Sequence, residues 1–470
     1  MASPVMILQL TRLSEDRVQV LTLKSPKGEP EAEVKLPFDR LQRRAVALSL
    51  EAQSFKPSDW DTAEGAQRLA ILRQLGMADE HGFTEDRLQR IGSALFAAFF
   101  PKGPLREALH AVLDTENAAN SPTRIELRLN TNATDLGLFP WELLYDDERQ
   151  NFLFSGRTSG IVRYIAHTRP APSLLTAEQL RVLFVAARPV DPMQVQELPD
   201  QEEAAIVQGF AEAKAEKSIA LDVLPPTSAG HSTYDLLHHA LNPGTPELQG
   251  HVLHFDGHGG YGVRCERCGF LNAPGRIACL RPGCGAPLGK AAQGYLAFEQ
   301  ADKSVHWISA AEFANLLAGT GIRLVVLTAC KSAVAAGESI FSGVAPALIG
   351  AGIPAVVAMQ YSISVPAASR FAQVFYRSLG QRSSLLASMG QVRAALFTPY
   401  PESWYRPVLY LRVHEANPEG RLCAKVKTSP KEKRKPGKAK TSADRGGVTI
   451  GNGANIYGEV SGRDIIKNNY

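Results

Sequence analysis

Hydrophobic and polar residues follow two different patterns along the chain, and the change comes near residue 180. In the first part, residues 17–23 (RVQVLTL) and 31–38 (EAEVKLPF) alternate apolar and polar positions on either side of a turn-rich segment, which predicts a β-hairpin. Residues 124–130 (RIELRLN) alternate in the same way after a segment with helical spacing. We therefore predict an α+β region over residues 1–175.

The second part combines continuous apolar runs with helical patterns. Apolar runs end in small or polar residues at 181–189 (RVLFVAARP), 251–260 (HVLHFDGHGG) and 323–333 (RLVVLTACKSA), and helical patterns such as residues 201–216 lie between them. Strands that are apolar throughout are buried on both faces, and their alternation with helices is typical of a mostly parallel sheet. The sequence predicts an α/β domain over residues 176–413, with helices on both faces of the sheet.

Composition indicates an ordinary globular protein, with 44% hydrophobic and 21% charged residues. The first residues become charged too early for a secretory signal, and the longest apolar run, residues 348–359, is too short to span a membrane. We therefore expect a soluble, cytoplasmic protein that does not enter a membrane.

The net charge of +4 is concentrated in one segment. Residues 425–440 contain eight basic residues and a single acid, Glu432, so the rest of the chain is slightly acidic. Such a run is usually a solvated linker, and we expect at most weak contact with nucleic acid through it. Residues 414–447 as a whole are rich in Lys, Pro and Gly and predict a flexible basic linker.

The last segment, residues 448–470, differs from this linker because isolated Ile and Val residues stand between Gly and Asn. It is too short to fold alone. Two interpretations remain open. The segment is either a disordered tail or a docking peptide that adds strands to a sheet edge of a separate sensor or activator protein.

Two chemically capable residues follow the carboxyl ends of buried strands. His258 comes after the strand in HVLHFDG, and Cys330 comes after the strand in RLVVLTA. Functional sites in parallel sheets gather beyond these ends. A cysteine acts as a nucleophile in its thiolate form, and a neighbouring histidine can accept and return the proton. The joint placement favours a Cys–His catalytic dyad over two structural residues, whereas His251 and His254 are expected in the core or behind the dyad.

Residues 251–260 and 323–333 resemble the histidine and cysteine motifs of the CHAT domain, a caspase-like family related to separase. Residues 136–165, which contain PWELLYD, are similar to the tryptophan-containing segment of CHAT proteins. Residues 352–379 resemble the strand and helix that follow the cysteine in this family. Together the similar segments cover most of residues 85–412.

This resemblance implies a caspase-like α/β fold and a cysteine endopeptidase, a peptide-bond hydrolase acting on protein substrates. Cys330 would be the nucleophile and His258 the general acid and base. The backbone N–H groups of Gly259 and Cys330 would form the oxyanion hole. The resemblance also implies a substrate cleft lined by Met359, Gln360, Tyr361 and Ser362. To these residues we add Asp256, an acid that could face a basic residue of the substrate.

Two features of the sequence limit what the resemblance implies. The cysteine lies in TACKSA, which differs from animal caspases, and the segment after the cleft strand reads SISVPAA, with Val365 where many relatives carry an acid. No cleavage preference is therefore transferred. Family members often act as regulated effectors in bacterial defence, including antiphage defence, or in cell death. The alternative function is a catalytically silent caspase-like scaffold that binds partners.

Four of the six cysteines predict a metal site. They are spaced C-x2-C, ten residues, C-x4-C, and each pair is accompanied by Gly. This spacing is typical of a structural zinc site in a small zinc ribbon, which we predict over residues 264–286 as an insertion. A degenerate, redox-active or iron–sulfur cluster is the alternative. The ligands begin seven residues after His258, so the ribbon would either order the histidine loop or bind substrate; they are Cys265, Cys268, Cys279 and Cys284.

Overall fold

The computed structural model describes the following parts of the chain: residues 4–52, 54–115, 122–165, 174–175, 177–195, 198, 200–226, 230–241, 250–328, 330–331, 341–412 and 417–423. Residues 1–425 belong to one compact unit by their internal contacts, and residues 426–470 lie outside the described part. The predictions made for the tail and for most of the basic linker concern residues outside this described part.

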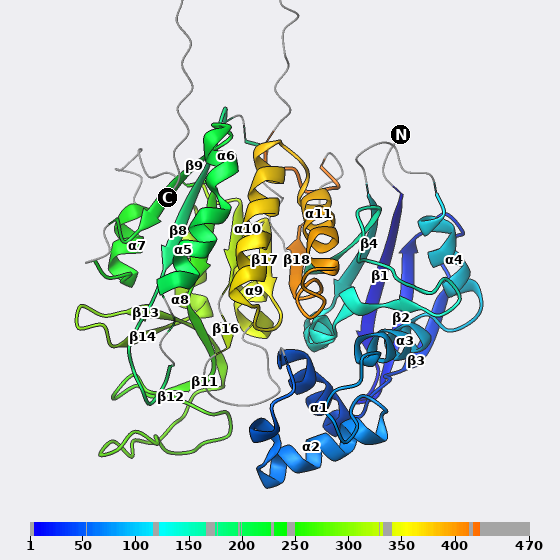
Figure 1. Ribbon diagram of the computed structural model, residues 1–470, viewed down its shortest axis with the longest axis horizontal. Coiled ribbons are helices and arrows are strands. Elements are labelled where there is room, and N and C mark those ends of the chain that lie inside the picture. The colour runs from blue at the N-terminus through cyan, green and yellow to red at the C-terminus, as the bar shows by residue number, and fades with distance from the viewer. Residues whose placement is uncertain are drawn as a thin grey trace, which may run out of the picture. The chain divides into compact units, whose positions relative to one another are not determined.

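The first unit is built on one large sheet, which among the described residues has eleven strands in the order β3-β2-β1-β4-β7-β18-β17-β15-β10-β8-β9 (Figure 1). These strands are β1 (Val5–Arg12), β2 (Arg17–Lys24), β3 (Glu31–Lys35), β4 (Thr123–Leu129), β7 (Ser159–Ile165), β8 (Leu180–Ala186), β9 (Ile219–Leu224), β10 (Val252–Asp256), β15 (Leu324–Leu327), β17 (Ala355–Met359) and β18 (Pro407–Leu411).

Most neighbours in this sheet are parallel. Strands β9, β8, β10, β15 and β17 run in one direction, and β18 is antiparallel to β17. Strands β1, β4, β7 and β18 are again parallel, and β2 and β3 form the predicted antiparallel hairpin at the edge. The predicted fold class, an α/β protein with a mostly parallel sheet, is therefore confirmed.

The α+β region and the α/β region share this one sheet. They meet where β18 pairs in parallel with β7, through Tyr410 and Arg163. All five residues of β18 are buried, because this strand returns to the middle of the sheet. The sequence pattern predicts each group of strands but contains no information on which edges pair.

Helices cover the sheet on both faces; they are α1 (Arg40–Glu51), α2 (Ala63–Gln74), α3 (Arg87–Phe99), α4 (Pro104–Leu113), α5 (Asp200–Gly209), α6 (Ala211–Ala215), α7 (Tyr234–Ala240), α8 (Ala310–Leu317), α9 (Phe341–Gly350), α10 (Val365–Gly380) and α11 (Leu385–Phe397). Successive residues of β15 show the two layers. Leu324 and Val326 pack in the core with α5, α10 and α11, which lie in front of the sheet in Figure 1. Val325 and Leu327 pack in the opposite core with α7, α8 and α9.

The single helix expected over residues 201–216 is divided into α5 and α6. Gly209, at the end of α5, lies against α10 so closely that an added Cβ would be 2.7 Å from the Ala372 Cβ. The glycine thus allows close packing of the two helices and also favours a break, because glycine is a poor helix former.

A second sheet stands beyond the carboxyl ends of β10 and β15 (Figure 1). Within the described residues, its strands are β11 (His258–Arg264), β12 (Leu271–Asn272), β13 (Gln293–Glu299), β14 (Val305–Ser309) and β16 (Cys330–Lys331). A further pair, β5 (Tyr145–Asp146) and β6 (Asn151–Phe152), and the short 3-10 helices η1 (Pro57–Trp60), η2 (Thr131–Leu138) and η3 (Trp141–Leu143) lie in the connections. Within the described ranges, we find no helix with the length and apolar character needed to cross a bilayer.

Candidate active site

The structure brings the backbones of His258 and Cys330 opposite each other. Strands β10 and β15 are parallel neighbours in the large sheet, and each is followed within three residues by a strand of the second sheet. These strands, β11 and β16, pair in parallel with His258 opposite Cys330 and Gly259 opposite Lys331. Backbones of neighbouring strands lie about 4.8 Å apart. His258 is buried, with 1% of its surface exposed.

The glycines after His258 let other segments approach β11. A Cβ on Gly260 would lie 2.4 Å from the Leu271 side chain, and one on Gly262 would lie 2.1 Å from the Asn272 carbonyl oxygen. Gly259, the predicted oxyanion donor, lies between β13 and β16 and pairs with both. Gly260 and Gly262 therefore have a packing reason, because β12 lies directly against them.

A chain of buried hydrogen bonds involves Asp256, two residues before His258 of the predicted dyad. The Thr328 hydroxyl donates to the Asp256 carboxylate (2.9 Å), so it accepts from Nε2 of His254 (2.9 Å). Nδ1 of His254 then accepts from the Tyr376 hydroxyl at 2.9 Å. Burial lowers the pKa of His254 to about 4, although Asp256 acts in the opposite direction, and burial raises the pKa of Tyr376. His254 is thus the neutral core residue that the sequence predicts.

Asp256 has its partners inside the protein. Its carboxylate is ion-paired with the Arg188 guanidinium and accepts a hydrogen bond from Thr328. Arg188 also donates to the Asp256 carbonyl oxygen at 3.1 Å, and Asp256 itself is only 1% exposed. Because this carboxylate is already neutralised, it could face a basic substrate residue only if Arg188 moved away.

The four other predicted cleft residues lie where β17 ends. Met359 is in the core, and the Gln360 N–H donates to the Arg406 carbonyl oxygen at 2.8 Å. Tyr361 is buried, which raises its pKa well above the ordinary value. The Ser362 N–H donates to the Glu51 carboxylate at 3.2 Å, and its hydroxyl also bonds to that oxygen. These contacts fix the backbone of the segment at the same edge as the dyad.

A buried charge cluster supports this segment from the PWELLYD block. Glu142 accepts two hydrogen bonds from Arg163, at 2.7 and 2.9 Å, and one from Arg393 at 3.2 Å. Arg163 also donates to the Gln360 side chain at 3.3 Å. All three charged side chains are fully buried. Sequence reasoning did not identify Arg163 and Arg393; the acid Glu142 among apolar residues indicates that a buried basic partner exists but not which residue it is.

The four cysteines of the ribbon have the geometry of a tetrahedral metal site. Their sulfur atoms all lie within 4.8 Å of one another, with Cys265–Cys284 at 3.8 Å and Cys268–Cys279 at 3.6 Å. A tetrahedron of thiolates about 2.3 Å from zinc has edges of about 3.8 Å. The residues present therefore fit a structural zinc ion.

The surroundings of the sulfur atoms are those expected for metal ligands. Gly269 and Gly283, one in each loop, have φ values of 73° and 76°, which only glycine adopts without strain. The buried Asn272 connects the loops, because its side chain donates to the Phe270 carbonyl oxygen at 3.0 Å and accepts from the Leu280 N–H at 2.8 Å. Its amide also contacts the Cys279 sulfur at 3.7 Å, a contact that orients a ligand.

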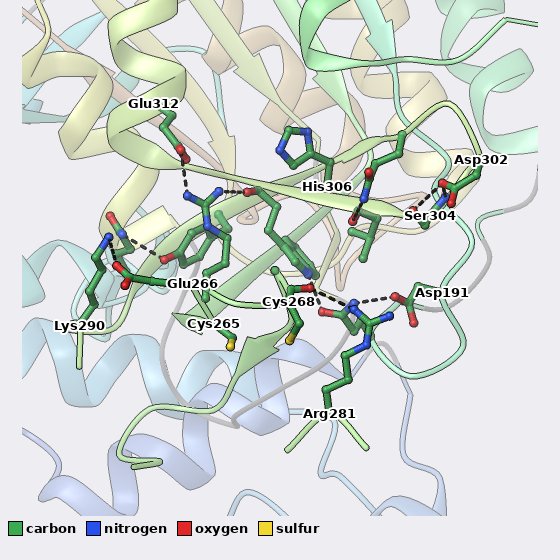
Figure 2. A pocket seen from close by; sticks show the side chains of 18 residues that line it. Asp191, Cys265, Glu266, Cys268, Arg281, Lys290, Asp302, Ser304, His306 and Glu312 are labelled. Carbon is green, nitrogen blue, oxygen red and sulfur yellow. Dashed lines mark hydrogen bonds and ion pairs between the residues drawn. The ribbon is translucent and has the colours of Figure 1, made fainter. Parts of the chain in front are cut away.

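A cavity of about 720 Å³ lies beside the ribbon, with Cys265 and Cys268 in one wall (Figure 2). Many of the charged residues that line this cavity are paired with each other, in the ion pairs Lys290–Glu266 at 2.7 Å and Arg264–Glu312 at 2.9 Å. Burial would raise the pKa of Glu312, but hydrogen bonds from Arg264 and Ser309 outweigh it and lower this pKa to about 2. The cavity therefore presents paired charges rather than an excess of one sign.

The site lies on an α/β sheet and places the backbones of a histidine and a cysteine opposite each other beyond the ends of adjacent strands. The chain belongs to the CHAT domain family, whose pattern matches residues 89–414, and the predicted family is thus confirmed. Among curated proteins, none matches the sequence significantly.

Solved structures with distant similarity include the three that follow. A chain of the Saccharomyces cerevisiae separase–securin complex has 11% identity and a TM-score of 0.41, and the match covers 86% of this chain and 30% of that one. The Arg-specific cysteine proteinase gingipain R has 10% identity and a TM-score of 0.34, over 74% of this chain and 70% of that one. A complex of its pro- and mature domains from Porphyromonas gingivalis is also matched. The chain spans less than a third of the separase-complex chain.

Proposed function

We propose that this protein is a cysteine endopeptidase that cleaves protein substrates through Cys330 and His258. The observation that carries the proposal is the parallel register of β11 and β16, with these two residues opposite each other. Membership of the CHAT family supports it, as does the resemblance of residues 251–260 and 323–333 to the histidine and cysteine motifs of that family. The alternative, a catalytically silent scaffold, would need neither residue.

In the proposed reaction, His258 accepts the thiol proton of Cys330, and the sulfur forms a bond to the scissile carbonyl carbon. The backbone N–H groups of Gly259 and Cys330 stabilise the oxyanion. The C–N bond then breaks as His258 gives its proton to the leaving amine, which leaves a thioester. Water loses a proton to His258 and attacks the thioester. The C–S bond breaks, and the carboxylic acid product leaves while the sulfur regains its proton.

The substrate is a protein segment bound along Met359–Ser362. The support is geometric: β17 and β15 are parallel neighbours, so the end of β17 lies next to the segment that leads to Cys330. The Glu51 and Arg163 contacts hold that backbone in place. Preorganised backbone lowers the entropy lost when a peptide binds. Asp256 contacts a basic residue of the substrate only after Arg188 has moved away from its carboxylate.

Zinc is the proposed resident metal of Cys265, Cys268, Cys279 and Cys284, where it would crosslink the two loops of the ribbon. Strand β11 connects the sites directly, because it begins at His258 and ends at Arg264, next to Cys265. We therefore assign the ribbon to ordering the histidine strand, with substrate contact as a second use.

Regulation is proposed to involve a separate sensor or activator protein that binds residues 448–470, within a bacterial defence or cell-death system. The support is the composition of this segment and its basic linker, together with the family. A cytoplasmic location is proposed because reduced thiols persist there.

Mapping of new protein N-termini tests the proposed activity. Cells that make the full chain, with its activating partner when known, are compared with cells that make Cys330→Ala or His258→Ala. We expect a set of cleavages that both variants lose. An identical set of N-termini in all three samples would contradict an endopeptidase and favour the scaffold.

A further inference from the structure

A second cavity, of about 240 Å³, lies between α1, the segment after η2, and the end of the β17 loop. Its lining includes the aromatic side chains of Phe38, Phe139 and Tyr361, which form its apolar part. Sites for drug-sized ligands are usually about 300 Å³ or larger. The size therefore fits a single side chain better than a cofactor.

Positive charge accumulates at the mouth of this cavity. Arg40, Arg43 and Arg44 of α1 line it, and its acid, Asp135, is already ion-paired with Arg12. Among the described residues, the guanidinium groups of Arg40 and Arg44 form no hydrogen bond or ion pair. Arg43 is held by the Phe38 carbonyl oxygen at 2.9 Å. Burial, together with the charge of Arg12, lowers the pKa of Arg43, while Asp135, Glu15 and Asp39 act in the opposite direction. An anion bound here would stabilise the charged form of these guanidinium groups.

The spacing on α1 directs two of the arginines to the same place. Arg40 and Arg44 are one helical turn apart and therefore lie on one face of the helix. Guanidinium groups bind carboxylates with two parallel hydrogen bonds, and the apolar part of the lining suits the methylene groups of Asp or Glu. The cavity beside the ribbon offers less unpaired positive charge, because Arg264 and Lys290 are already ion-paired with Glu312 and Glu266.

The cavity is connected to the proposed cleft. Tyr361 belongs both to its lining and to the segment that follows β17. At the other end of α1, Glu51 binds the N–H of Ser362, so the helix and the cleft segment are fixed to each other. In Figure 1, α1 lies at the lower edge of the sheet, the edge where β11 and β16 also lie.

We propose that this cavity receives an acidic side chain of the protein substrate and so selects the sequence that is cleaved. The proposal rests on the endopeptidase function above. The acid occupies a position a fixed number of residues from the cleaved bond, because the cavity and Cys330 belong to neighbouring strand ends. Arg40 and Arg44 are specificity residues and take no part in bond breaking.

The test uses a library of proteome-derived peptides incubated with the full chain in its active state. The variants are Arg40→Gln/Arg44→Gln and the charge reversal Arg44→Glu, with Arg90→Gln on α3 as a control in an exposed ion pair. Wild type and Arg90→Gln should enrich Asp or Glu at one position relative to the cleaved bond. The double variant should lower kcat/KM for such peptides by about ten-fold and leave neutral peptides within about two-fold. Arg44→Glu should abolish the enrichment of Asp or Glu at that position, because the new carboxylate pairs with Arg40 and repels an acidic side chain.

Each other outcome overturns the proposal. No acidic enrichment in wild type, or enrichment that survives in the double variant, removes the assigned site while leaving the peptidase intact. An equal loss of cleavage for acidic and neutral peptides assigns these arginines to folding. Absence of any Cys330-dependent cleavage overturns the endopeptidase function first, and this inference with it.

Discussion

The two ends of strand β11 are built in different ways. At its start, His258 lies between strands, next to two apolar cores and a buried hydrogen-bond chain. At its other end, the ribbon contributes a strand of only two residues and leaves Ile277 and Leu280 84% and 54% exposed. A segment with so little buried apolar surface cannot hold its shape without a crosslink. The His258 end thus depends on the fold, and we expect the ribbon end to depend on the proposed zinc ion.

Strand β11 links its two ends mechanically. Because seven residues of one strand connect the ends, loss of the metal removes support from one side of β11 only. The opposite edge of β11 remains paired with β13, and β16 still pairs with His258 and Gly259 on the β12 edge. We therefore expect damage at the ribbon to reach the dyad in weakened form, whereas damage near Asp256 changes the stability of the whole unit.

Removal of the metal has the largest expected effect. Structural zinc contributes about 10–16 kcal/mol to folding of small zinc modules, so a chelator, or Cys265→Ser/Cys268→Ser, should unfold the ribbon. Mass spectrometry under native conditions should find one zinc ion per wild-type chain and none in the variant. Limited proteolysis should then cut within residues 264–290 while the large sheet stays protected. Cys423→Ala, outside the ribbon, is the control; cutting at the same sites in this variant would contradict the assignment.

Asp256→Asn should have the next largest effect. It leaves the Arg188 charge without its buried carboxylate partner, which costs about 3 kcal/mol or more. Urea denaturation should show this loss for the whole first unit, with the zinc content unchanged. Asp302→Asn replaces an exposed carboxylate and should leave the midpoint unchanged. A stability equal to wild type in Asp256→Asn would show that the ion pair does not support the dyad end.

Gly262→Ala tests the contact between β11 and the ribbon. The new Cβ would lie 2.1 Å from the Asn272 carbonyl oxygen, so β12 must move. Overpacking of this kind costs about 2 kcal/mol, and we expect weaker zinc binding in a competition titration. Gly289→Ala is the matched control, since its Cβ would meet nothing within 4 Å. Equal zinc affinity in both variants would indicate that β12 does not transmit strain.

His254→Asn should weaken the dependence of stability on pH, in addition to a pH-independent loss from its buried hydrogen bonds. Burial holds the folded-state pKa of His254 at about 4, below its ordinary value of 6.5. Between these pH values the unfolded state binds more protons, so this residue makes stability fall as pH falls, by about 1.4 kcal/mol per pH unit. Denaturation curves from pH 7 to 4.5 should show a shallower acid loss in the variant. His81→Asn, at an exposed position, should keep the wild-type slope.

The same two ends show what a sequence can and cannot predict. The four cysteines of the ribbon are recognisable because the spacing of a metal-binding motif is contained in a short piece of sequence. The strand that leads to His258 is recognisable for the same reason. The pairing of His258 with Cys330 depends on the order of the strands in the sheet. The sequence pattern does not contain this order, and only the family resemblance indicated it. The Glu142–Arg163–Arg393 cluster could not be predicted, because its members are separated by up to 251 residues and meet only in the folded chain. Likewise, Tyr361 lies beside Arg44 only because α1 packs against the end of β17.

The central claim, that Cys330 is a nucleophile activated by His258, is tested most directly by active-site labelling. The full chain is treated with a peptide carrying a thiol-directed electrophile, with and without residues 426–470 and with its activator where known. Intact-mass and peptide analysis should find one label, on Cys330, formed at least about ten-fold more slowly in His258→Ala and normally in Cys423→Ala. Equal labelling of Cys330 in wild type and His258→Ala, or no labelling in any of these states, would contradict the account.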